Sequence, residues 1–110
     1  RIGAYFHDGL WTDIGAIDDY YQANFYMKDH AFFPMIKTRD NERYSDEDGN
    51  VICASANVFG KSVNSIVNAN ATIVSGVKVR NSIVLPKSVV ERSCTNCIIG
   101  QDFIFKLSTL

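Results

Sequence analysis

Residues 67–102 read VNANAT-IVSGVK-VRNSIV-LPKSVV-ERSCTN-CIIGQD when they are written in groups of six, and FIFKLS follows. The first position is apolar in every group except the one that begins with Glu91. The fifth position is small or β-branched until Gln101. A period of six fits neither the 3.6-residue period of an α-helix nor the two-residue alternation of an ordinary strand. This stretch therefore decides the fold.

A triangular coil explains the period, because each group supplies a short strand and a corner and three groups close one turn. We expect the first positions to point inward: Val67, Ile73, Val79, Leu85, Glu91, Cys97 and Phe103. We expect the fifth positions near the corners: Ala71, Val77, Ile83, Val89, Thr95 and Gln101. Residues that tolerate left-handed backbone angles are available for the corners: Asn68, Asn70, Gly76, Asn81 and Asn96. The sequence thus predicts a mainly β fold, a left-handed parallel β-helix of hexapeptide repeats with two full turns.

Two irregularities interrupt the six-residue frame. Before Val67 it slips, because a step back by six reaches Lys61 and the apolar Val58 and Val63 are five residues apart. We therefore expect an irregular first coil or a loop within it. Glu91 at an inward position indicates a local shift of one residue. An antiparallel sandwich of short strands is the alternative fold, but it does not explain the repeated sixes.

Composition excludes several classes of protein. A formal net charge of −1 in 110 residues gives no electrostatic footprint for nucleic acid or anionic lipid. No apolar run approaches the roughly 20 residues of a membrane-spanning helix, and no secretory signal is visible. We expect a cytoplasmic protein without a membrane or nucleic-acid partner. Because Arg1 comes first, we expect a fragment or a processed chain.

Cys53, Cys94 and Cys97 are an odd number of cysteines, which favours a reducing compartment over a disulfide framework. Cys94-x-x-Cys97 has the spacing of half a zinc site, but such a site needs four ligands and no second pair lies nearby. His7 and His30 are far upstream. We expect the cysteines to be buried as small apolar side chains.

Three segments differ in pattern: residues 1–36, the polar segment 37–50 (KTRDNERYSDEDGN), and residues 51–110. The first is predicted to form a hairpin of strands 2–6 and 10–12 with Asp8-Gly9 in the turn, and then a helix over 17–28. Asp18 and Asp19 would face the positive end of that helix, and Pro34 limits its length. The second is predicted to be a surface linker, and the third to be the β-helix.

The stretch GLWTDIGAIDDYYQAN, from Gly9 to Asn24, resembles the motif that closes the catalytic domain of sugar-1-phosphate nucleotidyltransferases. In that superfamily a linker and a left-handed β-helix follow, which is the order expected here. The phrases VNSIV (63–67) and IVSG (73–76) resemble bacterial glucose-1-phosphate adenylyltransferases. NSIVLPKSVVERSCTNCIIG (81–100) is also similar to mannose-1-phosphate guanylyltransferases and other NDP-sugar synthases.

The resemblance implies the end of an α/β catalytic domain that forms ADP-glucose and pyrophosphate from ATP and glucose 1-phosphate in glycogen synthesis. It implies Mg²⁺ as cofactor and assigns one carboxylate ligand to Asp13, with the other upstream of this chain. Trp11 and Gly15 would have packing and backbone roles. Ala16 departs from the Thr or Ser usual there, and a missing hydroxyl at a helix N-cap costs about 1 kcal/mol. That departure favours a non-catalytic regulatory paralogue as one alternative.

The chain lacks the Gly-rich triphosphate loop of that family, so we expect no catalysis from these 110 residues alone. The resemblance implies homo- or hetero-oligomer contacts through the β-helix and a share in an allosteric effector site. The cations available for an anionic metabolite are Lys78, Arg80, Lys87 and Arg92. A hexapeptide acyltransferase remains a further alternative, although the repeat region has no His for catalysis.

Overall fold

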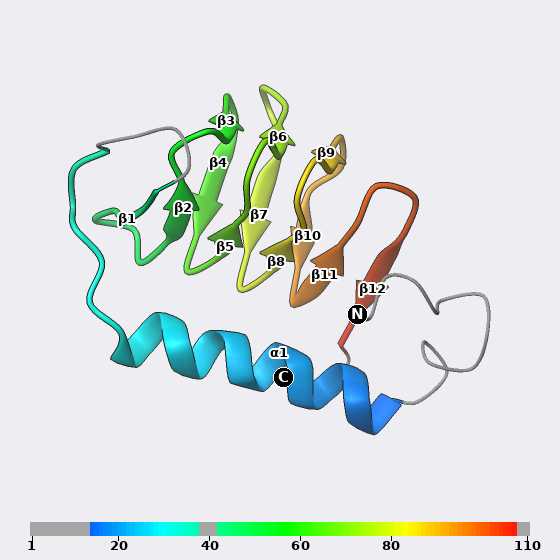
Figure 1. Cartoon of the computed structure of the whole chain (residues 1–110). Coiled ribbons are helices and arrows are strands. Elements are labelled where there is room, and N and C mark those ends of the chain that lie inside the picture. The colour runs from blue at the N-terminus through cyan, green and yellow to red at the C-terminus, as the bar shows by residue number, and fades with distance from the viewer. Residues whose placement is uncertain (1–13, 38–41, 108–110) are drawn as a thin grey trace. The chain divides into compact units, whose positions relative to one another are not determined.

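A computed structural model of the chain describes residues 14–37 and 42–107. The chain divides into two compact units, residues 1–30 and 31–110, which are described separately. The elements, labelled in Figure 1, are α1 (Ile14–His30), β1 (Arg43–Ser45), β2 (Val51–Cys53), β3 (Asn57–Val58), β4 (Lys61–Val63), β5 (Ile66–Val67), β6 (Thr72–Ile73), β7 (Lys78–Arg80), β8 (Ile83–Val84), β9 (Val89–Val90), β10 (Cys94–Thr95), β11 (Cys97–Ile99) and β12 (Ile104–Lys106).

Helix α1 begins three residues before the predicted start and ends two residues after the predicted end, four residues before Pro34. Because it begins at Ile14, Ala16 lies inside the first turn and not at the N-cap. Asp18 lies beyond the first turn, where the macrodipole no longer favours a carboxylate strongly. Both expectations about the helix start were therefore wrong. The predicted hairpin, Trp11 and Asp13 lie outside the described residues.

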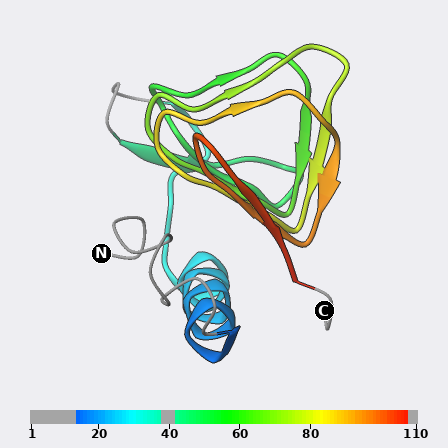
Figure 2. The same ribbon diagram turned by 90° about the vertical axis from the view of Figure 1, so that its right-hand side faces the viewer.

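The second unit is a parallel β-solenoid of about three turns whose strands form three sheets. Sheet A has the order β1-β2-β5-β8-β11-β12, sheet B has β3-β6-β9, and sheet C has β10-β7-β4. Figure 2 views the coils nearly end-on and shows their triangular outline. Successive strands of one sheet come from successive coils, and all pairs between coils are parallel.

The coils contain 15, 17 and 15 residues, as shown by the pairing of Ile52 with Val67, of Val67 with Val84, and of Val84 with Ile99. The inward positions are Ile52, Val67, Val84 and Ile99 in sheet A, Val58, Ile73 and Val90 in sheet B, and Ser62, Val79 and Cys94 in sheet C. From sheet A to sheet B the step is always six residues, and from sheet C to sheet A it is always five. From sheet B to sheet C it is four, six and four.

The prediction that Leu85 and Glu91 point inward was therefore wrong. Val84 and Val90 take those places, and Glu91 is exposed. The six-residue frame shifts by one residue between Val79 and Val84. This is the shift that Glu91 at a predicted inward position indicated. Beyond Ile83 the predicted corner positions fail too, because Val89, Thr95 and Gln101 are exposed, while Ser88 directly before Val89 is buried.

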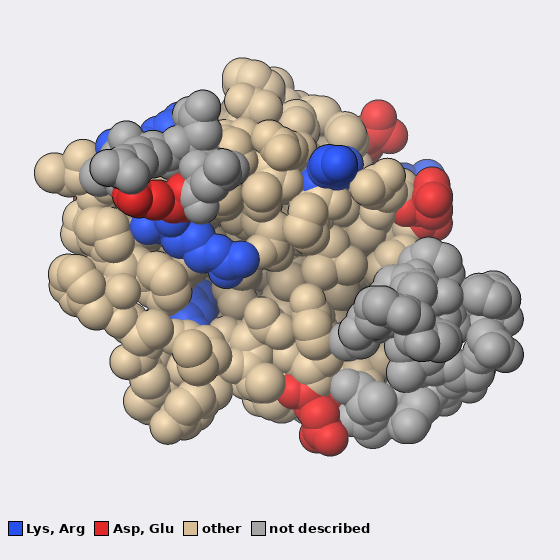
Figure 3. Space-filling view, in the orientation of Figure 1, with Lys and Arg blue, Asp and Glu red and all other residues tan. Residues whose placement is uncertain are grey.

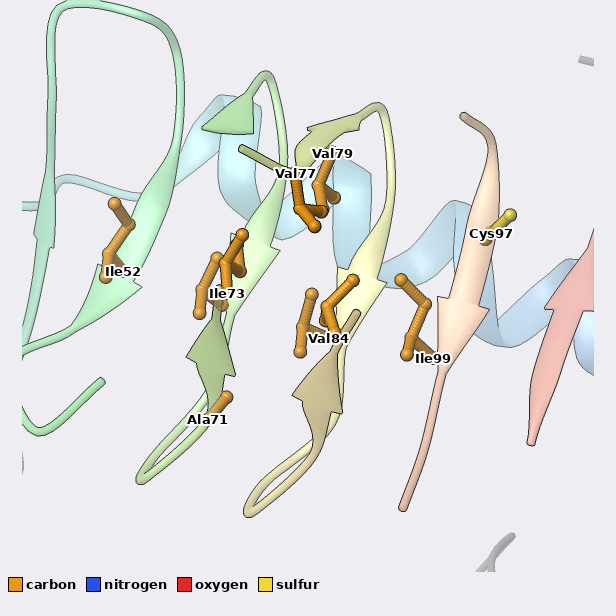
Figure 4. Packing of buried hydrophobic residues seen from close by; sticks show 10 residues of the cluster. Ile52, Ala71, Ile73, Val77, Val79, Val84, Cys97 and Ile99 are labelled. Carbon is orange, nitrogen blue, oxygen red and sulfur yellow. The ribbon is translucent and has the colours of Figure 1, made fainter. Parts of the chain in front are cut away.

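The solenoid interior is a narrow column of aliphatic side chains. Ten buried residues form it: Ile52, Val67, Ala71, Ile73, Val77, Val79, Val84, Val90, Cys97 and Ile99. In Figure 4 the labelled side chains point into the space enclosed by the coils. Branched aliphatic residues fill this column because each coil offers room for only three or four side chains, and each buried side chain contributes about 1.5–3 kcal/mol.

One corner of the solenoid, which we call the serine corner, repeats in every coil just before sheet A. Its first residue has positive φ: Gly49 (81°), Asn64 (48°), Asn81 (51°) and Asn96 (59°). Asparagine tolerates this left-handed backbone better than most residues. The Asn64 side-chain amide donates to Oδ1 of Asn81 at 2.8 Å, which links two coils. Positive φ also occurs at the predicted Asn70 and Gly76 but not at Asn68, whose amide donates to the Val84 carbonyl.

The second residue of the serine corner joins the coils by hydrogen bonds. The Ser65 N–H donates to Oδ1 of Asn50, the Ser82 N–H to Oγ of Ser65, and the Cys97 N–H to Oγ of Ser82, at 2.9–3.1 Å. Each hydroxyl also donates to the carbonyl two residues before it. Buried backbone donors are costly when unpaired, so these side chains stabilise the tight turn.

Short antiparallel strands flank sheet A at both ends. β1 pairs with β2 and β12 pairs with β11. β1 lies within the polar segment that was expected to be a linker, and its Tyr44 packs against the core. The Asp46 carboxylate closes the first hairpin by accepting hydrogen bonds from the backbone N–H groups of Asp48 and Asn50. Because the turn of this hairpin is built from polar side chains, the polar composition of segment 37–50 did not indicate a strand.

The corner between sheets B and C explains the longer second coil. Its extra residues are Ser75-Gly76, in a turn where the Val77 N–H donates to the Val74 carbonyl at 3.2 Å. The corner of the first coil approaches this turn so closely that a Cβ on Gly60 would overlap the carbonyl oxygens of Val74 and Val77. Glycine is therefore required at position 60.

Candidate anion-binding site

The outer face of sheet C carries cations because strand residues alternate between the two faces of a sheet. In β7, Val79 points into the core while Lys78 and Arg80 are exposed. β10 pairs with β7, with Thr95 opposite Arg80. Arg92 precedes β10, and Lys106 in β12 pairs with Cys97 at the start of β11. Strands from different coils and the final hairpin therefore bring these cations to one surface.

A surface cavity of about 780 Å³, here called the basic cavity, lies between these strands. It is lined by Lys78, Arg80, Arg92, Ser93, Cys94, Thr95, Cys97, Ile104 and Lys106. Four of these residues are cations and none is acidic. A cavity with one sign of charge raises the local concentration of the opposite ion, so an anion is the ligand that this lining favours.

Among the described residues, the one salt bridge joins Lys28 to Asp29. None of the four cations of the cavity therefore has an acidic partner within that part of the chain. Lys106 donates from Nζ to the Thr95 carbonyl at 3.0 Å, which holds its stem along the cavity wall. The Ser93 hydroxyl accepts a hydrogen bond from the Lys78 N–H at 2.9 Å and fixes the turn beside Arg92. Arginine and lysine are the usual donors for phosphate and carboxylate groups.

The two cysteines of the cavity differ in exposure. Cys97 is buried and Cys94 is half-buried. Burial, together with a smaller effect of the neighbouring Cys94, raises the pKa of the Cys97 thiol to about 11. Cys97 therefore stays protonated at neutral pH, and its Sγ donates to the Thr95 carbonyl at 3.3 Å. The expected burial is confirmed for Cys53 and Cys97, whereas Cys94 is only partly buried.

A second cavity of about 380 Å³ lies at the end of the last coil. Glu91 and Asp102 line it together with Arg92, so its charge is mixed and favours no class of ligand. Figure 3 shows one face of the molecule, where charged side chains form small separate groups on a largely uncharged surface. The basic cavity is thus the strongest candidate site among the described residues.

Of the cations singled out from the sequence, the structure brings Lys78, Arg80 and Arg92 together, while Lys87 does not line the cavity. Sequence reasoning missed Lys106, because it ended the repeats at residue 102. The apolar–polar–apolar order of Phe105, Lys106 and Leu107 is the short sequence signal of a strand that could have placed it.

Asp13, the residue assigned to Mg²⁺, lies outside the described residues. Within residues 14–37 and 42–107, no group of three or more His, Cys, Asp or Glu side chains is arranged to hold a metal ion. Within the same residues no helix is long and apolar enough to cross a membrane. In comparisons with family models, curated proteins and solved structures, the chain matches none of them.

Proposed function

We propose that the chain is the C-terminal part of a cytoplasmic sugar-1-phosphate nucleotidyltransferase of the glucose-1-phosphate adenylyltransferase type. Its solenoid is a left-handed β-helix, a variant of the hexapeptide fold whose corners are shortened to give coils of 15 and 17 residues. One observation carries the proposal: a parallel solenoid follows a helix that begins directly after the Trp11-Thr12-Asp13 motif. This is the order that the resemblance implies.

In the intact enzyme, the sugar phosphate attacks the α-phosphorus of ATP and releases pyrophosphate. Mg²⁺ would stabilise the charge on the phosphate oxygens, with Asp13 as one ligand and a carboxylate upstream as another. These 110 residues would contribute no further catalytic group. Their role is assembly, through the coil faces and ends, and regulation.

The basic cavity supports the regulatory part of the proposal. Its four cations, from β7, the turn before β10 and β12, would bind a small phosphorylated effector through charge-assisted hydrogen bonds. A phosphorylated metabolite fits this lining better than a neutral sugar, because a neutral ligand would leave the clustered positive charge without compensation.

The catalytic proposal is tested on the full-length protein that contains this chain. Pyrophosphate release is measured with ATP, GTP, dTTP and UTP, each with glucose 1-phosphate and mannose 1-phosphate. We expect ATP with glucose 1-phosphate to give the highest kcat/KM, and D13N to reduce kcat at least a hundredfold. Preference for GTP with mannose 1-phosphate would instead identify a guanylyltransferase. Absence of turnover with every pair would indicate a regulatory paralogue or an acyltransferase.

The effector site is tested on the 110-residue chain by titration with pyrophosphate and glucose 1-phosphate, followed by NMR. We expect shifts at Lys78, Arg80 and Lys106, and at least a tenfold weaker affinity in R80A. The matched control is K61A, because Lys61 pairs with Lys78 in the same sheet but does not line the cavity. Equal weakening by both variants would refute the site.

A further inference from the structure

Two thiols lie together on the wall of the basic cavity. Cys94 in β10 and Cys97 in β11 are joined around the serine corner by Thr95 and Asn96. Both cysteines are free, and they are near enough in the fold that Cys94 contributes to the raised pKa of Cys97. Cys94 Sγ donates to the carbonyl of Arg92, another residue of the cavity lining, at 3.5 Å. Figure 4 shows Cys97 on its strand as one of the residues of the buried column.

The preceding coils show that packing does not require cysteines at these positions. The register places Val79 and Ser82 one coil before Cys94 and Cys97. One coil earlier, the pair is Ser62 and Ser65. Ser82 donates to the carbonyl two residues before it, as Cys97 does, so the corner accommodates either a hydroxyl or a thiol. Thiols stand at both positions only in the coil that borders the cavity.

The charge of the cavity selects the reagent that reaches these thiols. Lys78, Arg80, Arg92 and Lys106 line the same cavity as the two cysteines, and no lining residue is acidic. An anionic disulfide is therefore concentrated next to Cys94, whereas a cationic disulfide is repelled. Cys53 is buried and does not line the cavity. The positive charge of the cavity therefore does not concentrate an anionic disulfide next to Cys53.

We propose that Cys94 and Cys97 form a reversible disulfide by thiol–disulfide exchange with a small anionic disulfide that binds in the basic cavity. The inference uses the charge and the thiols of the cavity and does not depend on the nucleotidyltransferase assignment. It makes the last coil a modification site that responds to the oxidation of the cellular thiol pool.

The exchange proceeds in two balanced steps. The Cys94 thiol loses its proton, and the thiolate attacks one sulfur of the reagent, forms a mixed disulfide and releases one reagent thiolate. The Cys97 thiol then loses its proton, and its thiolate attacks Cys94 Sγ and releases the second reagent thiolate. The two protons end on the two released thiols. Two protein thiols are oxidised, and one reagent disulfide is reduced. Excess reagent thiol reverses both steps.

The second step has a pH signature. Because burial raises the pKa of Cys97 to about 11, its thiolate fraction increases about tenfold for each pH unit between 7 and 9. The mixed disulfide at Cys94 therefore accumulates at pH 7 and converts faster at pH 9. Cys97→Ser stops the reaction at the mixed disulfide, and Cys94→Val prevents modification at Cys97. Both substitutions copy residues of the preceding coil, so the variants are expected to fold.

The test exposes the 110-residue chain to oxidised glutathione, which is anionic, and to cystamine, which is cationic, at low and high salt. Mass spectrometry distinguishes loss of two hydrogens from addition of a reagent half, and peptide mapping assigns the cysteines. We expect glutathione to react about tenfold faster than cystamine at low salt. High salt should remove the difference, R80A should reduce it, and K61A should leave it unchanged.

Four outcomes would overturn the proposal. Equal rates for the two reagents at low salt would show that the cavity charge does not select the disulfide. A mixed disulfide at Cys94 that persists at pH 9 would show that the two sulfurs do not pair. Modification of Cys53 as fast as Cys94, or no modification at all, would remove the assigned role of the cavity. Pyrophosphate titration is a separate measurement, so failure of the effector site and failure of this site are distinguishable.

Discussion

The serine corner makes a quantitative prediction for Ser82→Ala. Ser82 is fully buried, and its Oγ accepts a hydrogen bond from the Cys97 N–H at 3.0 Å and donates to the Arg80 carbonyl at 2.8 Å. After truncation the Arg80 carbonyl still accepts the Asn96 N–H at 3.0 Å, but the Cys97 N–H has no acceptor. The substitution thus leaves one buried donor unpaired and removes the hydrogen bond from the hydroxyl to the Arg80 carbonyl. We expect the free energy of unfolding to fall by about 2 kcal/mol.

The measurement is equilibrium unfolding in urea, followed by circular dichroism, together with hydrogen exchange at the Cys97 amide. S82A should exchange faster at that amide than the wild type. S82C should lose less stability, because Cys97 already places a sulfur at the equivalent corner position. The control is S75A, at an exposed corner residue, with a change within about 0.5 kcal/mol. A loss below that value for S82A, or unchanged exchange at Cys97, would refute the reasoning.

Three further predictions concern stability. Gly60→Ala should destabilise the chain by about 3 kcal/mol, because its Cβ has no room against two carbonyl oxygens. Gly76→Asn should cost less than about 1 kcal/mol, because its Cβ meets open space and asparagine tolerates the positive φ at this position. The urea midpoints of the two variants test both values. Asn81→Ala should lose about 1 kcal/mol at its positive φ, and Asn81→Gly should lose less. The raised pKa of Cys97 means that the native state holds its proton above pH 9 while the unfolded state releases it. Stability should therefore fall from pH 9 to about 11 more steeply in the wild type than in C97S, and parallel curves would contradict this.

The sequence was sufficient to predict the parallel solenoid, since short apolar steps through Val67, Ile73 and Val79 have the period of a coil. It could not supply the coil lengths. A step of four or five residues at one corner moves every later inward position, and Glu91 was the local sign of that shift. The correct frame requires the pairing of coils that lie 15 to 17 residues apart along the chain.

The candidate site was harder to predict for the same reason. Lys78, Arg80 and Arg92 are close in sequence. Whether they share a surface depends on which face of its strand each residue occupies and on how the next coil pairs with that strand. Lys106 joins them because β12 returns antiparallel beside β11, which no repeat pattern predicts. Asparagine at corners was predictable at Asn81 and Asn96 from its backbone preference, whereas Lys87 at positive φ follows from its place after Pro86 in a tight turn.

The extra turn of the second coil shows how this architecture tolerates insertions. Ser75 and Gly76 add two residues between β6 and β7. Even so, β6 pairs in parallel with β3 and β9, and β7 pairs in parallel with β4, which belong to the shorter coils. The length of a corner loop can therefore change, in evolution or by design, without disturbing the pairing between the strands of successive coils. Peptide grafts between Ser75 and Gly76 are expected to be accepted there, whereas the same graft at Gly60 would meet the coil that lies next to it.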